Sequence, residues 1–489
     1  MKKIIVVLAG LVVVVWGMLF FMNRPTQIPG PVDEIPIEKP AGEEGESPDA
    51  VNNSTLPIPQ ILEDTDPSPD RAEFFMVAQN GSREFFPGVW TETMGYNGDF
   101  LGPVIRTRRG ETVAVNVENS LTGELTTIHW HGLEVEGEDD GGPHSGIHPG
   151  ETWSPEFTID QPAATLWYHP HPHYNTGRQV YKGLAGLFII EDEVSDLLDI
   201  PKEYGKNDIP LIIQDKRFGE DGSLEYILGG PDVMFGLMGN EILVNGEIGP
   251  YLHVEKGLMR FRILNGSNAT IFDLRLDDGS SFHQIATDGG FLEEPVELER
   301  LILGPSERAE ILMDFSSYQD GERISLSHRD RSFMEFIVDG NRVNDYAVPG
   351  SLTEIEWLKP EDATRTREFV FLGMGPTVNI NGKQFDMDRI DEYVNLGDTE
   401  IWVVSNQSGM GMMAGSVHPF HAHGTQFQIL DRDGNPPYIF ERGWKDSFVV
   451  DADETVRVIA RFKKPGLFMY HCHILEHEDV GMMGQFLVE

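Results

Sequence analysis

The chain has a single cysteine, Cys472, among 489 residues. A disulfide needs two cysteines, so the fold cannot depend on an intrachain disulfide. Basic residues are also scarce, because 37 Lys and Arg face 80 Asp and Glu and the formal net charge is −43. Proteins bind nucleic acid largely by neutralising phosphates with Lys and Arg, so we expect no nucleic-acid partner. A field of this sign would concentrate cations, although it serves equally well to keep the protein soluble.

Long apolar runs are absent with one exception, at the N-terminus. Lys2 and Lys3 precede an uncharged run over residues 4–22, which approaches the length that spans a bilayer. No small-residue cleavage site follows this run. We therefore expect a signal anchor over residues 1–22 that holds the rest of the chain outside the cytoplasm, with a cleaved signal peptide and secretion as the alternative. Residues 23–70 are rich in acids and prolines and are expected to form a disordered linker.

The remaining sequence predicts an all-β fold. It is rich in glycine and proline, and short runs of Val, Ile, Leu and Phe lie between turn residues. Four segments alternate between apolar and polar residues as half-buried strands do: 111–117, 258–264, 308–314 and 455–462. A chain of this length is expected to form about three domains. The predicted domains are 71–195, 205–350 and 365–489.

The densest group of chemically active side chains lies near the C-terminus, where residues 470–483 read Tyr-His-Cys-His-Ile-Leu-Glu-His-Glu-Asp-Val-Gly-Met-Met. Cys472 is flanked by two histidines and is followed by His477 and Met482. Ligands of these kinds suit copper, because a blue-copper site takes two His, one Cys and a weak axial Met. His418 can supply the second His.

The order His471-Cys472-His473 carries a further prediction. Neighbouring side chains of a strand point to opposite faces, and residues two apart share a face. Cys472 should therefore face one metal site while the two histidines face another. One peptide segment would then connect the two sites, as an enzyme needs if it takes up electrons at one place and uses them at another.

Eight histidines form four His-x-His pairs: His129/His131, His169/His171, His421/His423 and His471/His473. The surroundings of the first pair resemble those of the third, and the second those of the fourth, so we infer an internal duplication. Pro170 takes the place of Cys472 in the first copy, so only the second copy can build the blue site. Eight imidazoles from two related units indicate a metal cluster at their interface. Zinc and a Cys/His nucleophilic pair are weaker interpretations, because each would leave several imidazoles unexplained.

These motifs resemble those of the multicopper oxidases, in particular the bacterial copper-efflux oxidase and laccase branch. The motifs are His-Trp-His-Gly-Leu-Glu (129–134), Asp-Gly-Gly-Pro (140–143), Trp-Tyr-His-Pro-His (167–171), Gly-Leu-Ala-Gly (183–186), His-Pro-Phe-His-Ala-His-Gly-Thr-Gln-Phe (418–427), Gly-Trp-Lys-Asp (443–446) and the 470–483 segment. The resemblance extends over roughly residues 71–489. It implies three cupredoxin-like Greek-key β-barrel domains, with the copper cluster between the first and the third and the second as a spacer.

The resemblance also implies four copper ions per chain and a ligand set for each. The blue, or type 1, ion would be held by His418, Cys472 and His477, with Met482 in the axial position. The type 2 ion would be held by His129 and His421. The type 3 pair would be held by His131, His169 and His473 on one ion and by His171, His423 and His471 on the other.

Two carboxylates, Glu478 and Asp140, are the candidates for proton transfer. Reduction of O2 to water consumes protons, and the resemblance implies that these two groups supply them. Alternatively, Asp140 forms a turn before Gly141, and Glu478 is a solvated charge. His173 lies two residues beyond His171 but has no counterpart in the second copy, so we expect it beside the ligands or on the surface.

The reductant is the least determined part of the prediction. The expected activity is laccase-like, a one-electron oxidation of a phenolic, organic or metal-ion donor coupled to the four-electron reduction of O2 to water. Copper-efflux enzymes carry a methionine-rich insert, whereas this chain has only Met374, Met387, Met410, Met412 and Met413 in that region, and Ala414 replaces an acidic metal-binding residue. Cuprous oxidation is therefore an alternative, and a non-catalytic copper-binding envelope protein is an alternative of another class. We expect a monomer.

Overall fold

The structure is a computed structural model that describes residues 54–226, 228–408 and 416–489. The predicted signal anchor and residues 23–53 of the predicted linker lie outside the described residues, as do Met410, Met412, Met413 and Ala414. Within the described ranges, no helix combines the length and the apolar character needed to cross a membrane.

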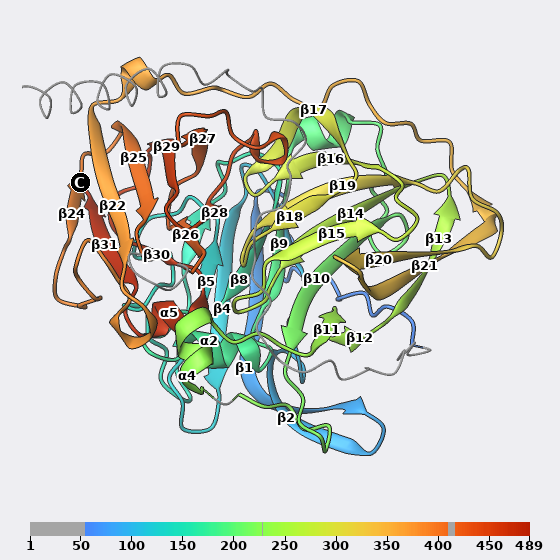
Figure 1. The fold of residues 1–489 in the computed structure, drawn as a ribbon, viewed down its shortest axis with the longest axis horizontal. Helices are drawn as coiled ribbons and strands as arrows, with labels where there is room; N and C mark the ends of the chain where they lie inside the picture. Colours follow the sequence, from blue (N-terminus) through green and yellow to red (C-terminus); the bar gives the residue numbers. More distant parts are fainter. Residues whose placement is uncertain (1–53, 227, 409–415) are drawn as a thin grey trace, which may run out of the picture. The chain divides into compact units, whose positions relative to one another are not determined.

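The described residues form β-sheets that follow one another along the chain in three pairs, as the all-β prediction requires (Figure 1). The strands of the first pair are β1 (Arg71–Phe86), β2 (Val89–Tyr96), β3 (Ile105–Arg108), β4 (Thr112–Ser120), β5 (His129–His131), β6 (Thr152–Trp153), β7 (Glu156–Thr158), β8 (Ala164–His169) and β9 (Gly186–Glu191). Their order is β2-β1-β4-β6, with β7 beside β4, in one sheet and β3-β9-β8-β5 in the other. An apolar core that includes Phe74, Trp130 and Phe188 fills this pair.

The second pair of sheets uses β10 (Asp208–Lys216), β11 (Glu241–Val244), β12 (Glu247–Ile248), β13 (Tyr251–Lys256), β14 (Leu258–Asn265), β15 (Phe272–Leu276), β16 (Phe282–Thr287), β17 (Gly290–Leu298), β18 (Leu301–Leu303), β19 (Arg308–Asp314), β20 (Arg323–His328) and β21 (Arg331–Val343). Their orders are β12-β11-β10-β14-β19-β16-β17 and β13-β21-β20-β15-β18.

The third pair uses β22 (Arg365–Leu372), β23 (Asn379–Ile380), β24 (Glu392–Val394), β25 (Thr399–Asn406), β26 (His418–Ala422), β27 (Phe427–Arg432), β28 (Ser447–Val450), β29 (Thr455–Arg461), β30 (Gly466–Cys472) and β31 (Met483–Val488). Their orders are β23-β22-β25-β29-β27 and β24-β31-β30-β26-β28. Short helices lie between the strands: α2 (Thr176–Tyr181), α3 (Glu193–Leu197), α4 (Gly230–Phe235), α5 (Leu475–Asp479), η1 (Pro360–Asp362), η2 (Gly375–Thr377) and η3 (Ile439–Glu441).

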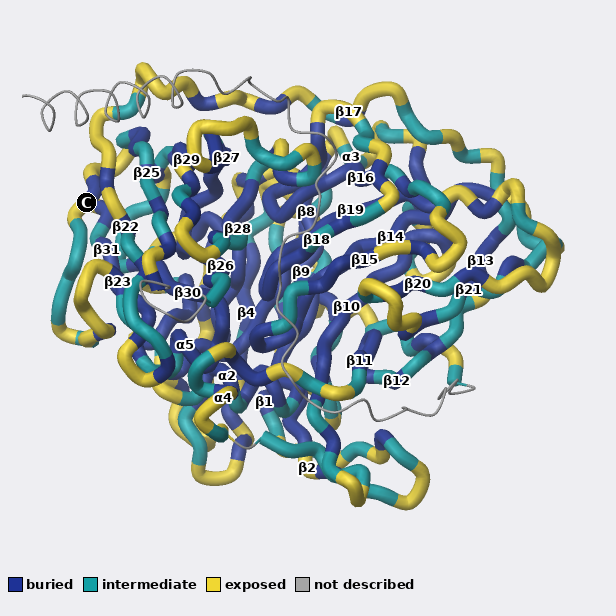
Figure 2. The backbone as a smooth tube through the Cα atoms, viewed as in Figure 1, coloured by how far each residue is buried: buried dark blue, intermediate teal, exposed yellow. Residues whose placement is uncertain are grey.

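The four predicted strands are present as β4, β14, β19 and β29, but two of them are not half-buried. β14 is buried along its whole length, and β19 is buried up to its last residue (Figure 2). Apolar and polar residues do alternate along these strands, but the face that carries the polar residues is buried as well. Arg262 of β14 donates to Thr165 of the first pair of sheets at 2.8 Å and forms ion pairs with Asp208 and Glu310. A charged layer therefore joins the first and second pairs of sheets, where the sequence predicted a solvated face.

The predicted linker ends before residue 70. Leu56 is buried, and its backbone N–H donates to the Tyr251 carbonyl at 2.8 Å. Further along, the Val104 N–H donates to the Gln60 carbonyl at 2.8 Å. Residues 54–62 therefore bind by their backbone to both the first and the second pairs of sheets. Backbone hydrogen bonds hold the segment together with a few apolar contacts, such as that of Leu56 in the core of the second pair of sheets, and neither is evident from a composition rich in acids and prolines.

Candidate metal centre

The two copies of the histidine motif have the same strand register. β5 pairs antiparallel with β8 so that His129 lies opposite His169, and β26 pairs antiparallel with β30 so that His421 lies opposite His471. Each copy therefore presents two imidazoles from facing positions of a strand pair. In two of the pairs the second histidine lies beyond the end of the strand. β8 ends at His169, before His171, and β30 ends at Cys472, before His473.

The first group of candidate ligands lies at the end of β30. The Cys472 sulfur is 3.4 Å from His418 Nδ1 and 3.9 Å from His477 Nδ1, and the two Nδ1 atoms are 3.3 Å apart. Ligand atoms around a three-coordinate ion with bonds of about 2.0–2.3 Å would be separated by roughly 3.5–4 Å. Met482 is also buried, and its carbonyl accepts a hydrogen bond from the Cys472 N–H at 3.0 Å. This triangle therefore fits one ion.

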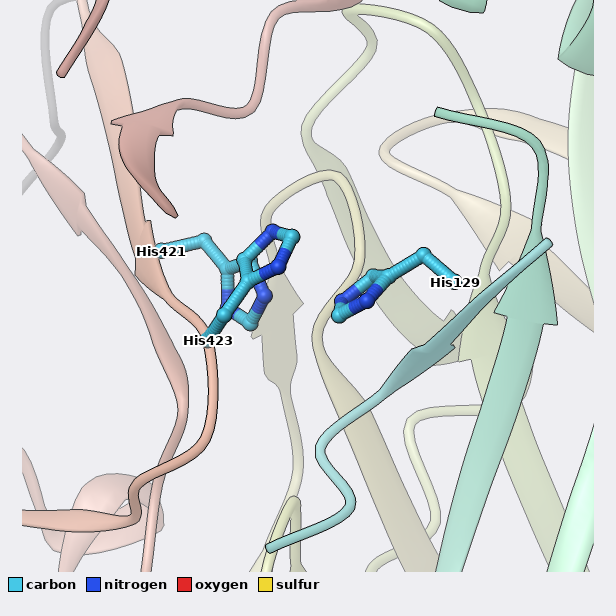
Figure 3. Close-up of side chains that lie close together, drawn as sticks. All are labelled: His129, His421 and His423. Atoms are coloured by element: carbon cyan, nitrogen blue, oxygen red, sulfur yellow. The ribbon is translucent and has the colours of Figure 1, made fainter. Parts of the chain in front are cut away.

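The eight paired imidazoles form the second group, and the segment His471-Cys472-His473 connects it to the first. His171 Nε2 and His423 Nε2 each lie 3.2 Å from His471 Nε2. His131 Nδ1 lies 3.3 Å from His169 Nε2. The rings of His129 and His423, one from each copy, stack with centroids 3.7 Å apart (Figure 3).

Most of these imidazoles have one nitrogen held by the protein and the other directed into the group. His129 Nδ1 lies 3.0 Å from the Asp140 carbonyl, and His421 Nδ1 lies 2.8 Å from the Asp446 carbonyl. The Nε2 atoms of both rings are buried without a hydrogen-bond partner, as are both ring nitrogens of His473. Such contacts on the far side of a ring fix the orientation of metal-ligating histidines.

Burial also sets the protonation state of the imidazoles. It lowers the pKa of seven members of the second group: His131, His169, His171, His421, His423, His471 and His473. The pKa of His471 falls to about 3, and that of His477 in the first group falls to about 4. These rings are therefore neutral at pH 7, which leaves a nitrogen lone pair free for a metal.

Both predicted carboxylates lie against the second group, and neither is a solvated charge. Glu478, on α5, lies 3.4 Å from His171 Nδ1 and 3.2 Å from His471 Nδ1. Burial, reinforced by Asp479, raises the pKa of Glu478 well above its usual range, which favours its protonated form. Asp140 is buried, and its Oδ2 lies 2.7 Å from His423 Nδ1.

The structure groups the ligands partly as the resemblance implies. His418, Cys472 and His477 lie together, and so do His171, His423 and His471. His129 and His421 lie with His423, while His131 and His169 lie with His129 and not with His473. The ring centroid of His473 is 5.1 Å from that of His131 and 5.5 Å from that of His169. His173 stacks on Tyr174 beside Phe385, outside these groups.

Asp446, the last residue of the Gly-Trp-Lys-Asp motif, has contacts in the centre that the sequence did not predict. Asp446 Oδ1 lies 3.1 Å from His131 Nε2 and accepts a hydrogen bond from Arg308 Nη1 at 2.7 Å. All three side chains are fully buried. Burial alone would raise the pKa of Asp446, but Arg308 outweighs it and holds that pKa below its usual value. The three residues come from the third, first and second pairs of sheets, so each pair contributes to the centre.

Thiolate, imidazole and thioether side chains beside eight further imidazoles are a donor set for copper. Two family models described as multicopper oxidase match residues 78–195 and 356–489. The multicopper oxidase mco of Staphylococcus aureus is 39% identical over 433 residues, which cover 88% of this chain and 92% of that protein. The cell division protein FtsP of Escherichia coli is 37% identical over 457 residues, which cover 88% of this chain and 92% of that protein.

Among solved structures, the multi-copper oxidase from Pediococcus acidilactici superposes with a TM-score of 0.85 and 41% identity, covering 89% of this chain and 92% of that one. The chain belongs to the multicopper oxidase family. The resemblance found in its motifs is thereby confirmed, and membership of this family implies copper binding and indicates a copper oxidoreductase that uses O2 and a reductant.

Proposed function

We propose that this chain is a laccase-like multicopper oxidase that couples one-electron oxidation of a phenolic, organic or metal-ion donor to the four-electron reduction of O2 to water. The observation that carries the proposal is the continuity of the two ligand groups. Cys472 belongs to the first group, and its immediate neighbours His471 and His473 belong to the second. A single buried segment thus connects the place where a donor delivers electrons with the place where O2 is reduced.

The residues present fit copper at both groups. The unpartnered nitrogens of His129, His421 and His473 are buried polar atoms that would each cost free energy without a ligand. The four-ion assignment follows the resemblance: type 1 at His418, Cys472, His477 and Met482, type 2 at His129 and His421, and type 3 at the remaining six imidazoles. When bound, copper supplies the one-electron redox chemistry that no side chain of this set supplies alone.

The protein itself provides protons and orientation. Glu478 lies against two imidazoles of the second group, and burial favours its protonated form, so it is placed to donate a proton to O2 as it is reduced. Asp140 fixes His423 and, through its carbonyl, His129, which belong to different copies of the motif. We infer that Asp140 fixes the positions of His129 and His423 relative to each other and that, together with Glu478, it transfers protons to O2.

A second candidate function is a non-catalytic copper-binding envelope protein, because the similarity to FtsP covers nearly the whole chain. The complete set of copper ligands and the two buried carboxylates, Glu478 and Asp140, favour the oxidase over the binding protein. Cuprous oxidation remains an alternative for the donor. Residues 1–22 support a location outside the cytoplasm with attachment to the membrane, and we propose that the protein acts there as a monomer.

The test is to load the purified protein with copper and to measure colour and oxygen uptake. The donors are Cu(I), Fe(II), Mn(II), a dimethoxyphenol and a bulky dye. The expected result is a blue protein that consumes oxygen with at least one donor. A copper-loaded protein that consumes oxygen with none of them would support the binding protein, and a protein that retains no copper would contradict both proposals.

A further inference from the structure

The outer edge of His477 is covered by a helix from the second pair of sheets. His477 Nδ1 faces Cys472 and His418, so Nε2 lies on the other edge of the ring. That nitrogen is 3.2 Å from the carbonyl oxygen of Met234, in α4, and the His477 side chain is fully buried. When Nδ1 uses its lone pair as a ligand, Nε2 carries the hydrogen and donates it to Met234.

The two residues that follow α4, Gly236 and Leu237, hold its C-terminal end against α5 and the residue before it. The Leu237 N–H, just after α4, donates to Glu476 Oε2 at 3.0 Å. Gly236 approaches α5 so closely that a Cβ built there would lie 2.6 Å from Ile474 Cγ2 and 2.3 Å from Ala269 Cβ. Its φ of +82° is also a conformation that side chains rarely adopt. The position therefore requires glycine, and this close approach holds the Met234 carbonyl on His477.

The surface that a donor meets is accordingly not the imidazole. Phe235 is 44% exposed and Met238 is 42% exposed, whereas His477 is covered. A phenol that reduces a site through a hydrogen bond to this imidazole needs the Nε2–H, and Met234 already occupies it. A donor that passes an electron without direct contact does not need that hydrogen.

We propose that α4 determines donor specificity by occupying the outer edge of His477, which disfavours phenols relative to donors that react without touching the imidazole. This inference rests on the proposed function and narrows its donor class. It also assigns a task to the second pair of sheets, which the sequence predicted to be a spacer.

The sole cysteine gives a readout that needs neither copper nor turnover. Cys472 lies behind His477, so the rate at which DTNB modifies the copper-free protein reports how often the cover opens. Gly236→Ala should displace α4 and raise this rate about tenfold, which corresponds to about 1.4 kcal/mol of opening free energy. In the copper-loaded protein, the kcat/KM for 2,6-dimethoxyphenol should rise about tenfold relative to that for hexaammineruthenium(II).

Two matched glycine variants separate local opening from general destabilisation. Gly230→Ala lies on the same helix, where a Cβ meets nothing within 4 Å, and it should label at the wild-type rate. Gly257→Ala is strained and crowded by Asn344, in the turn between β13 and β14, so it should lower the unfolding temperature without faster labelling under native conditions. If Gly236→Ala fails to fold, replacement of residues 230–235 by a short Gly-Ser loop makes the same test.

Wild-type labelling in Gly236→Ala or in the loop variant would overturn the proposal, and so would an unchanged ratio of phenol to ruthenium activity. Immediate labelling of the wild-type protein would also overturn it, because the cover would then be open. Failure of the proposed function looks different. In that case no donor supports oxygen uptake, while the contrast in thiol labelling between Gly236→Ala and Gly230→Ala remains.

Discussion

The first and third pairs of sheets carry the same strand pair in the same register, yet only the third carries a complete mononuclear site. Counting from the facing histidines, the positions that hold His418, Cys472, His477 and Met482 in the third pair hold Thr126, Pro170, Asn175 and Val180 in the first. The backbone scaffold is thus common to both copies. Four side chains distinguish the copy that carries the Cys472 ligand group from the copy that does not.

The two copies also depend on each other. Asp140 of the first copy holds His423 of the second, and Asp446 of the second holds His131 of the first. Arg308, from the second pair of sheets, completes the second contact. The eight paired imidazoles are therefore shared between the two copies, whereas the group of His418, Cys472 and His477 belongs to the second copy alone.

The largest expected effect comes from removing the feature that distinguishes the copies. Cys472→Ser replaces the thiolate with a hydroxyl, which is not a comparable ligand for copper. We expect complete loss of blue colour and of oxygen uptake, measured by absorption and with an oxygen electrode, while the imidazole group keeps its copper. A blue or active Cys472→Ser protein would remove the basis of the comparison.

Glu478 tests whether the second copy also has its own proton donor. The equivalent position of the first copy is Thr176, and it cannot serve as a comparable acid. Glu478→Gln keeps the shape and removes the acid, so oxygen turnover should fall by about 10²–10⁴-fold at unchanged copper content. Thr176→Ser, which keeps the hydroxyl, is the control and should retain activity. Unchanged turnover in Glu478→Gln would show that protons arrive by another route.

Asp446→Asn tests the contact exchanged between the copies. The substitution removes the carboxylate nearest to the buried Arg308 and leaves it only the Asp288 carboxylate, at 3.7 Å, so the cost should approach the roughly 3–5 kcal/mol of breaking a buried pair. Chemical denaturation should show a loss of this order. Asp431→Asn provides the control, because its partner Arg457 is half-exposed and the loss should stay within about 1 kcal/mol. Equal losses of unfolding free energy in the two variants would mean that the Asp446 contact stabilises the fold no more than the half-exposed Asp431–Arg457 pair does.

The smallest effect is expected from moving one ligand into the first copy. Pro170→Cys should add one thiol, counted with DTNB after denaturation, and should leave the blue absorption per molecule unchanged. The reason is that Thr126, Asn175 and Val180 would still lack ligand atoms suited to copper. A rise in blue absorption would show that the surrounding three positions matter less than the comparison implies.

The sequence predicted the ligands better than their surroundings. The eight paired histidines and Cys472 were recognisable because strand periodicity places alternate residues on one face, and that rule acts within a few residues. Asp446 and Arg308 contact residues that are 315 and 138 positions away in the chain, and no local pattern records such contacts. The buried polar face of β14 was missed for a related reason, since alternation shows polarity and not what covers it.

The position of the helices was equally beyond the sequence. α5 is too short for a helical period to be detected, although it carries both His477 and Glu478. The contact of Met234 with His477 joins segments 243 residues apart through a backbone carbonyl, which no side-chain motif can encode.

The sharing of side chains between the two ends of the chain has a consequence for biosynthesis. His471, Cys472 and His473 belong to the last nineteen residues, and they are among the last to leave the ribosome. Until they do, the first ligand group lacks Cys472 and the second lacks His471 and His473, although Asp140, Asp446 and the rings they contact have already been made. Neither ligand group is therefore complete before the end of the chain has been made and has docked onto the rest.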